Sequence, residues 1–263
     1  MDTQKPLANK TVLITRARDQ ADECIRLLTE RGASVIEFPT IEVIPPQSWS
    51  DLDQALNEIE AFHWIIFSSA NAVRFFMERF QTLGKNARIL DGIRICAVGP
   101  KTAASLKVFG LEPKLVPAEF KAEGVLDALD NEEVKGLRFL IPRAREAREV
   151  IPDKLRERGA LVRVVTAYEN VMPVADASRI KSLFEQKKID IVTFTSSSTV
   201  RNFVEMLGQK GYKTIIQGVS IACIGPVTAE TAREYGLQVD IMPKEYTVPA
   251  LVDAMVNFFK KPT

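Results

Sequence analysis

The sequence AVGPKTA at residues 97–103 has a near copy, CIGPVTA, at residues 223–229, and this pair decides the fold. Three further pairs lie outward from it at the same spacing: ITRAR (14–18) with IPRAR (141–145), LTERGA (28–33) with LRERGA (155–160), and WIIFSS (64–69) with IVTFTS (191–196). The residue numbers of matched positions differ by 126 or 127 in every pair. A register held over that length indicates two copies of one series of strand–helix units, and therefore two lobes with a cleft for a ligand.

Length and composition fit a two-domain globular protein. The chain has 263 residues, of which 46% are hydrophobic and 26% charged, as in ordinary soluble domains. The formal net charge is only +1, so no overall field attracts nucleic acid or an anionic membrane. We expect neither as a partner.

The residue inventory also restricts location and metal chemistry. The first residues lack the apolar core of a signal peptide, and no apolar run approaches the roughly 18 residues of a membrane span. Cys24, Cys96 and Cys223 are far apart and form no CxxC spacing, which favours a reducing, cytoplasmic setting. His63 is the only histidine, and a lone histidine does not supply a histidine-rich zinc site or a serine–histidine–aspartate triad with the rest of this chain. We expect no metal.

Short apolar runs alternate with longer amphipathic stretches along both halves. The expected strands are residues 12–14, 35–38, 65–67, 93–98 and 115–116, then 139–141, 162–165, 191–194, 221–224 and 239–241. The expected helices are residues 20–30, 52–59, 72–80, 101–109 and 125–129, then 146–158, 177–187, 199–207, 228–235 and 248–259. Alternating strands and helices, with strands apolar on both faces, predict two flavodoxin-like α/β domains, each a doubly wound parallel sheet covered by helices.

The domain boundary has two readings. Proline-containing stretches at residues 38–46 and 166–173 occupy equivalent places and each follows the second strand of its half. Matched linkers suggest that the halves exchange their first two strands, since prolines mark chain that leaves a compact layer. One domain would then be 1–38 plus 174–263 and the other 46–166, with linkers 39–45 and 167–173. The alternative is a cut near residues 131–133, and the double proline at residues 45–46 favours the exchange.

Ligands of open α/β sheets bind beyond the carboxyl ends of the strands, so the residues that follow each strand are the candidates. Arginines follow the first strand of each half, and their planar donor forks suit carboxylate or phosphate. Solvated surface charge is the alternative role. The candidate binding residues of this group are Thr15, Arg16, Arg143 and Arg145.

Hydroxyl clusters follow the third strand of each half. Such hydroxyls cap the next helix, and the same helix start offers amide donors to an anion. Both roles are compatible. The candidate binding residues are Ser68, Ser69, Asn71, Thr195, Ser196 and Ser197.

Gly-Pro turns follow the fourth strand of each half. Proline suits the first helical position, so a plain strand-to-helix turn is the simplest interpretation. The pattern matches neither GxGxxG nor GxxxxGK[ST], which disfavours dinucleotide binding and nucleotide hydrolysis. The candidate binding residues are Gly99, Lys101, Thr102, Gly225 and Thr228.

Tyr168 lies in the second linker, beside the expected cleft. A tyrosine there can be a packing anchor with a hydrogen-bonded tip. It can also give a proton to a leaving group, which makes it the candidate catalytic residue.

Taken together, these motifs resemble the uroporphyrinogen-III synthase family over essentially the whole chain. The resemblance is carried by LITR (13–16), FSSANAV (67–73), AVGPKTA (97–103), TAYE (166–169), FTSSSTV (194–200), CIGPVTA (223–229) and PKEYT (243–247). It implies two α/β domains joined by a two-stranded linker and built by the exchange described above.

The resemblance also implies an activity. The family is a cofactor-free hydro-lyase of porphyrin and heme biosynthesis that cyclises the linear tetrapyrrole hydroxymethylbilane to uroporphyrinogen III, inverting ring D and releasing water. The path it implies runs through an azafulvene cation and a spiro intermediate. Tyr168 then becomes the candidate acid for the departing hydroxyl, and Thr102 and Thr228 match functional threonines. We expect a monomer, with hydroxymethylbilane synthase as a candidate donor of the substrate.

One competing function remains from another class. A two-lobed protein could bind a small anionic ligand, such as a sugar phosphate, without chemistry. Hydroxymethylbilane closes spontaneously to the uninverted isomer, so formation of isomer III distinguishes the enzyme from the binding protein.

Overall fold

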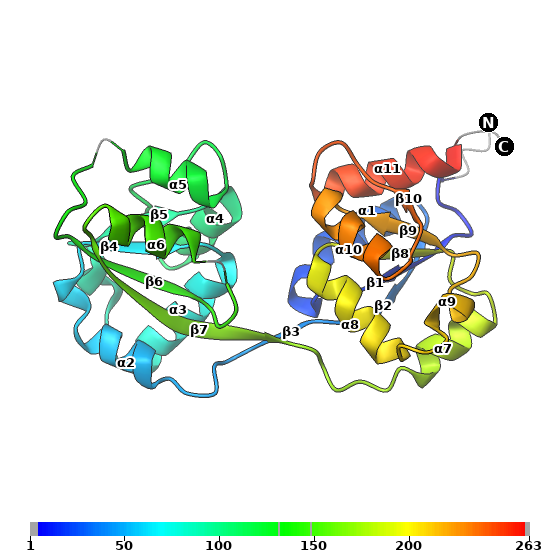
Figure 1. The fold of residues 1–263 in the computed structure, drawn as a ribbon, viewed down its shortest axis with the longest axis horizontal. Helices are drawn as coiled ribbons and strands as arrows, with labels where there is room; N and C mark the ends of the chain where they lie inside the picture. Colours follow the sequence, from blue (N-terminus) through cyan, green and yellow to red (C-terminus); the bar gives the residue numbers. More distant parts are fainter. Residues whose placement is uncertain (1–4, 131, 148, 261–263) are drawn as a thin grey trace. The chain divides into compact units, whose positions relative to one another are not determined.

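The computed structural model describes residues 5–130, 132–147 and 149–260, and the chain forms two compact units (Figure 1). Unit 1 combines residues 1–42 with 171–263, and unit 2 comprises residues 43–170. The chain therefore passes between the units twice. The alternative cut near residues 131–133 falls inside unit 2; Asn131 itself lies outside the described residues.

Unit 1 is built on a five-stranded sheet in the order β10-β9-β8-β1-β2. Every pairing in it is parallel. Its strands are β1 (Thr11–Ile14), β2 (Ser34–Glu37), β8 (Ile191–Phe194), β9 (Ser220–Cys223) and β10 (Val239–Ile241). Its helices are η1 (Arg18–Gln20), α1 (Asp22–Glu30), α7 (Ser178–Glu185), α8 (Ser197–Leu207), α9 (Tyr212–Ile215), α10 (Pro226–Glu234) and α11 (Val248–Lys260).

Unit 2 is built on a second five-stranded sheet in the order β3-β7-β6-β4-β5. The pairings of β6 with β7, β4 with β6 and β4 with β5 are parallel. Its strands are β3 (Glu42–Ile44), β4 (Trp64–Phe67), β5 (Arg94–Ala97), β6 (Arg138–Ala144) and β7 (Leu161–Val171). Its helices are α2 (Ser50–Asn57), η2 (Ile59–Ala61), α3 (Ala70–Thr82), η3 (Ala87–Leu90), α4 (Pro100–Val108), α5 (Ala122–Ala128) and α6 (Val150–Glu157).

Successive strand residues enter separate cores because side chains alternate across a sheet. In β1, Val12 and Ile14 belong to the core with α1 and α11, whereas Leu13 belongs to the core with α7 and α8. In unit 2, Trp64 of β4 packs with residues of α5 and α6, and Ile65 packs with residues of α2 and α3. Helices thus cover both faces of each sheet (Figure 1), and the predicted fold class is confirmed.

The strand orders show how the repeat is arranged. The run β9-β8-β1-β2 of unit 1 matches the run β5-β4-β6-β7 of unit 2, since the matched strands are the repeated sequences. Each unit therefore combines at least two strands from the first copy with at least two from the second. The strand expected at residues 115–116 is reduced to a single bridge between Cys96 and Leu115.

The chain segments expected as linkers differ from that expectation in detail. Residues 42–44 form β3, and β7 continues to Val171, so both segments enter the sheet of unit 2 as neighbours. Proline at residues 45–46 ends β3 after three residues, because proline cannot donate to a strand ladder. The helix expected from residue 146 begins at Val150, and Arg148 lies outside the described residues.

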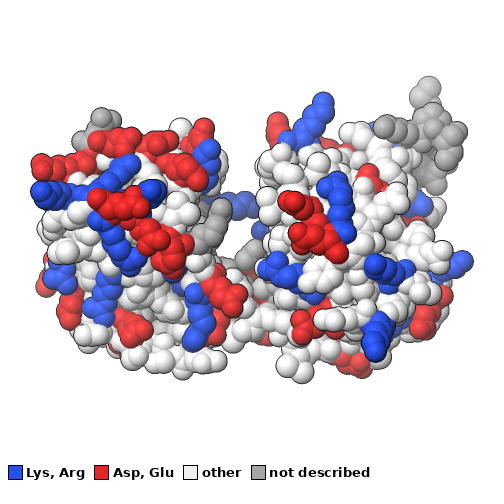
Figure 2. Space-filling model, in the orientation of Figure 1, with Lys and Arg blue, Asp and Glu red and all other residues white. Residues whose placement is uncertain are grey.

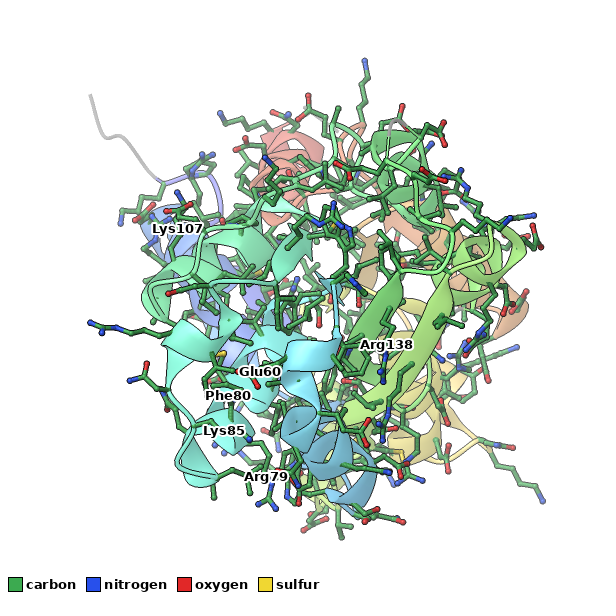
Figure 3. The ribbon with its side chains drawn as sticks, turned by 90° about the vertical axis from the view of Figure 1, so that its left-hand side faces the viewer. Glu60, Arg79, Phe80, Lys85, Lys107 and Arg138 are labelled. Carbon is green, nitrogen blue, oxygen red and sulfur yellow. The ribbon has the colours of Figure 1, made fainter. Side chains whose placement is uncertain are left out.

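An ion pair between charged side chains joins helices α2 and α3. Arg79 of α3 donates from Nε and Nη2 to both carboxylate oxygens of Asp53 on α2, at 2.6 Å each, and Figure 3 shows Arg79 beside the α2 ribbon. On the face in Figure 2, basic and acidic side chains are interspersed, in keeping with the sequence totals of 35 and 34.

None of the helices in the described ranges combines the length and apolar character that a membrane span requires.

Candidate active site

The carboxyl edge of the unit 2 sheet brings several candidate residues together. Register pairs Arg143 with Thr166 and Ala144 with Tyr168, and the Arg145 amide donates to the Tyr168 carbonyl at 3.0 Å. The turns after β4 and β5 end at the same edge because these strands run parallel to β6. The Val98 amide donates to the Phe67 carbonyl at 3.0 Å, which fixes one turn against the other.

Tyr168 is a buried phenol whose hydroxyl has one hydrogen-bond partner among the described residues. The residue is 7% exposed, its hydroxyl lies 3.1 Å from Ser69 Oγ, and its ring stacks on Phe75 with centroids 5.8 Å apart. Burial raises the pKa of Tyr168, and the Ser69 hydrogen bond partly offsets that rise. The phenol is therefore protonated at neutral pH and fixed in orientation, so both roles considered for it, anchor and proton donor, are compatible with its geometry.

The hydroxyl clusters cap helices in both units. Ser69 Oγ accepts from the Ala72 amide at 3.1 Å at the start of α3. Ser196 Oγ accepts from the Thr199 amide at 3.2 Å at the start of α8, and Thr199 Oγ1 accepts in return from the Ser196 amide. This reciprocal pair is a capping box, which satisfies two amides that the helix leaves open.

The Gly-Pro turns have the same conformation in both units. Gly99 and Gly225 precede α4 and α10 in extended conformations, with φ of −163° and −171°. Any residue can adopt these φ values, so the turn itself does not require glycine. The proline that follows each glycine occupies the first helical turn, where its missing N–H is not needed.

Thr102 and Thr228 are equivalent threonines in the first turns of α4 and α10. Each is only 5% exposed. Among the described residues, neither hydroxyl has a hydrogen-bond partner. Trp64 Nε1 is the only fully buried side-chain nitrogen or oxygen without a hydrogen-bond partner in the described ranges, so both threonine hydroxyls keep access to solvent and are available to a ligand.

The arginines already have acidic or amide partners. Arg143 is 9% exposed and donates to Glu149. Arg145 donates from Nη2 to Glu169 Oε1 at 2.7 Å. In unit 1, Arg16 donates from Nη2 to Gln20 Oε1 at 3.0 Å, and burial lowers its pKa. An incoming anion would compete with these partners.

Of the remaining candidate binding residues, some are buried and others are exposed to solvent. Thr15 is fully buried and donates to the Thr193 carbonyl at 2.6 Å, so its hydroxyl joins β1 to β8. Ser197 Oγ accepts from Thr231 Oγ1 at 2.7 Å. The others reach the surface at least in part: Ser68 and Lys101 are exposed, and Asn71 and Thr195 are half-buried.

Glu169 is a residue of this edge that the sequence reading missed. Its Oε1 accepts from the Gln47 amide at 2.8 Å as well as from Arg145. The hydrogen bond from the Gln47 amide has the largest effect on the pKa of Glu169 and lowers it. Arg145 lowers this pKa further, and burial acts in the opposite direction. The carboxylate thus joins the segment after β3 to β7 and β6. Its place directly after Tyr168 in the TAYE motif was the available signal.

Both units are α/β domains with hydrogen-bond donors at the carboxyl ends of their parallel strands. The protein therefore belongs to the class of α/β proteins that bind small molecules beyond these strand ends. The family model described as "Uroporphyrinogen-III synthase HemD" matches residues 22–253. The chain is 36% identical to the uroporphyrinogen-III synthase of Synechococcus elongatus, over 99% of each protein. It is 33% identical to that of Chlorobaculum parvum, over 95% of this chain and 100% of the relative.

Solved structures of low sequence identity share the fold. A crystal structure of a mutant uroporphyrinogen III synthase from Thermus thermophilus matches with a TM-score of 0.65 at 17% identity, covering 96% of this chain and 100% of the other. The enzyme from Helicobacter pylori matches with a TM-score of 0.60 at 18% identity, covering 94% and 99%. The chain belongs to the uroporphyrinogen-III synthase family. The family expected from the motifs is thereby confirmed.

Proposed function

We propose that this chain acts as a uroporphyrinogen-III synthase by holding the substrate's carboxylates on the donor groups of its sheet edges while Tyr168 protonates the leaving hydroxyl. Members of the family cyclise hydroxymethylbilane to uroporphyrinogen III, with inversion of ring D and loss of water. The observation that carries the proposal is the matched pair of threonine hydroxyls, on Thr102 and Thr228, that have no hydrogen-bond partner in the described part of the chain.

The substrate's chemistry explains why many neutral donors suit it. Hydroxymethylbilane is a flexible chain of four pyrroles bearing acetate and propionate groups. The helices α3, α4, α8 and α10 start at the carboxyl edges of their sheets. Their first turns offer amide donors and the positive end of the helix dipole to carboxylates. The exposed or half-buried Ser68, Asn71, Lys101 and Thr195 add side-chain donors.

The first chemical step is loss of the terminal hydroxyl. The carbon–oxygen bond breaks as the pyrrole nitrogen lone pair forms the azafulvene cation, and the departing oxygen takes the Tyr168 proton to leave as water. Ring D then attacks through its substituted carbon to give the spiro intermediate, which fragments and recloses. The proton lost as the last ring regains aromaticity returns to the phenolate, so the enzyme ends unchanged.

The raised pKa of Tyr168 limits what this acid contributes. A phenol with a raised pKa is a weak donor at neutral pH, and general acids work best with a pKa near the working pH. The pyrrole nitrogen must therefore supply most of the driving force for departure. The larger contribution of the protein is to orient the chain for closure at the inverted position.

The test is turnover of hydroxymethylbilane with the product isomers resolved by chromatography. We expect the wild-type chain to make isomer III, and Tyr168→Phe to lower kcat about 10²-fold, the low end for general acid catalysis. Product affinity should change less than kcat. Unchanged kcat in Tyr168→Phe would remove the acid role. Isomer I alone, formed at the uncatalysed rate by the wild type, would favour the non-catalytic anion-binding protein.

The other parts of the proposal concern the setting of the reaction. The three cysteines are free and buried, which suits a reducing cytoplasm. We also propose that the enzyme works as a monomer and receives hydroxymethylbilane from hydroxymethylbilane synthase. Light scattering of the purified chain tests the first point, and competition by an added trap for free hydroxymethylbilane in a coupled assay tests the second.

A further inference from the structure

Each unit carries one strongly exposed aromatic ring at a matching place in the repeat. Phe120 ends the sequence PAEF at residues 117–120, and Tyr246 ends PKEY at residues 243–246, the same 126-residue spacing that relates Gly99 to Gly225. Phe120 is 61% exposed and Tyr246 is 60% exposed. A single exposed aromatic residue needs no explanation, but two at equivalent positions of a duplicated scaffold do.

Both rings lie against the glycine of a Gly-Pro turn. A Cβ atom placed on Gly99 would lie 3.7 Å from Cβ and Cγ of Phe120. One placed on Gly225 would lie 3.2 Å from Cγ and Cδ1 of Tyr246. The Gly225 approach is tighter than normal van der Waals contact. Since φ does not require glycine at either turn, the close approach of the ring gives a reason for glycine at Gly225.

Most of the surface of each ring faces solvent. In the described part of the chain, Phe120 and Tyr246 make no aromatic or cation–π contact, and the Tyr246 hydroxyl has no hydrogen bond. Each ring therefore leaves most of its surface to solvent, directly beside the helix start that holds Thr102 or Thr228.

This combination selects a ligand chemistry. An exposed aromatic face binds a flat, electron-rich or cationic ring, and a helix start binds a carboxylate. A pyrrole with acetate and propionate arms has both features on one small group. We propose that Phe120 and Tyr246 each pack against a pyrrole ring of the substrate while the carboxylate arms of that ring reach the adjoining turn.

This inference rests on the proposed function and extends it from the carboxylates to the ring faces. It also assigns the two aromatic residues a share in holding the azafulvene cation, because a ring face attracts a neighbouring cation.

Steady-state kinetics on hydroxymethylbilane, with isomers resolved, test the assignment. Phe120→Leu and Tyr246→Leu should each raise KM about 3- to 10-fold, the range expected for one aromatic contact, and should raise the share of isomer I. Phe120→Tyr and Tyr246→Phe keep the ring face and should stay within about twofold of the wild type. Phe258→Leu on α11, where Phe258 is 39% exposed, is the matched control and should leave KM unchanged.

The glycines provide a second, independent measurement. Gly225→Ala should displace the Tyr246 ring and raise KM, whereas in a Tyr246→Leu background it should add little. Gly99→Ala should have a smaller effect than Gly225→Ala because its Cβ meets only ordinary contact distances.

The outcomes separate the two proposals. If the wild type makes isomer III but the leucine variants match it in KM and isomer ratio, the ring assignment is wrong and the proposed function stands. A KM increase that is equal in leucine and aromatic variants, or that is accompanied by a matching loss of thermal stability, also overturns it. If the wild type makes only isomer I, the proposed function itself fails.

Discussion

The hydroxyl of Tyr168 and Oγ of Ser69 lie 3.1 Å apart, and the same Ser69 oxygen accepts from the Ala72 amide at the start of α3. One serine therefore caps a helix and holds the candidate acid. Its counterpart in the other unit, Ser196, caps α8 and sits 127 residues further along the chain. The repeat thus supplies a natural comparison between a cap with a phenol partner and a cap without one.

Ser69→Ala and Ser196→Ala should each lower the free energy of unfolding by about 1 kcal/mol, the usual value of a helix cap. Chemical denaturation measures this loss. Ser105→Ala, in the middle of α4, is the control and should change stability by less than about 0.5 kcal/mol. Only Ser69→Ala should also raise the pKa of Tyr168, because the Ser69 hydrogen bond lowers that pKa. An unaltered tyrosinate absorbance titration in Ser69→Ala would contradict the coupling.

The raised pKa of Tyr168 makes stability depend on alkaline pH. Where the folded pKa exceeds the unfolded one, the folded state retains the proton longer, so stability is fully present below the unfolded value and falls as pH rises towards the folded value. The difference in unfolding free energy between the wild type and Tyr168→Phe should be constant below the ordinary tyrosine pKa of about 10 and decline above it. A difference that stays flat above that pH would show that the phenol is not buried in solution.

The internal repeat allowed the fold to be predicted from the sequence. The hydrogen-bond partners of individual side chains could not be predicted in this way. Strands such as Trp64–Phe67 are continuous apolar runs bounded by turn residues, a local pattern that sequence displays. The strand at Glu42–Ile44 is too short and too mixed in character to show periodicity, and it exists through its place beside β7 in the sheet.

The candidate site divides in the same way. The capping roles of Ser69 and Ser196 follow from their position before a helix. The burial of Thr15 against the Thr193 carbonyl depends on which strand lies beside β1, a contact between residues 178 positions apart. The role of Glu169 depends equally on Gln47, which lies 122 positions away. Pairings of this kind carry no local signal.

The three cysteines should be unreactive in the folded protein. Burial raises the pKa of Cys24 to about 11 and those of Cys96 and Cys223 to about 12. At pH 8 the thiolate, which is the reactive form, is then about one part in a thousand or less. An aromatic disulfide reagent should label no thiol in the native protein within minutes and all three in guanidinium. Rapid native labelling of one cysteine would place it at the surface.

Asn202 and Thr40 are joined by a hydrogen bond close to the point where the chain crosses from unit 1 to unit 2. Thr40 is fully buried, its amide donates to the Thr15 carbonyl at 2.9 Å, and its own carbonyl accepts from Asn202 Nδ2 at 2.7 Å. Asn202→Leu keeps the side-chain volume but leaves that buried carbonyl without its partner, which should cost about 1–3 kcal/mol.

Denaturation of Asn202→Leu beside Arg201→Leu, an exposed neighbour on the same helix, measures that cost, and the Arg201 variant should stay within about 0.5 kcal/mol of the wild type. Amide hydrogen exchange adds a local readout. Because the Asn202 contact holds the end of the crossing segment, the Thr40 amide should exchange faster in Asn202→Leu than the loss of global stability alone explains. Equal stability in the two variants, or exchange at Thr40 that only follows global unfolding, would show that α8 does not hold the crossing chain through this residue.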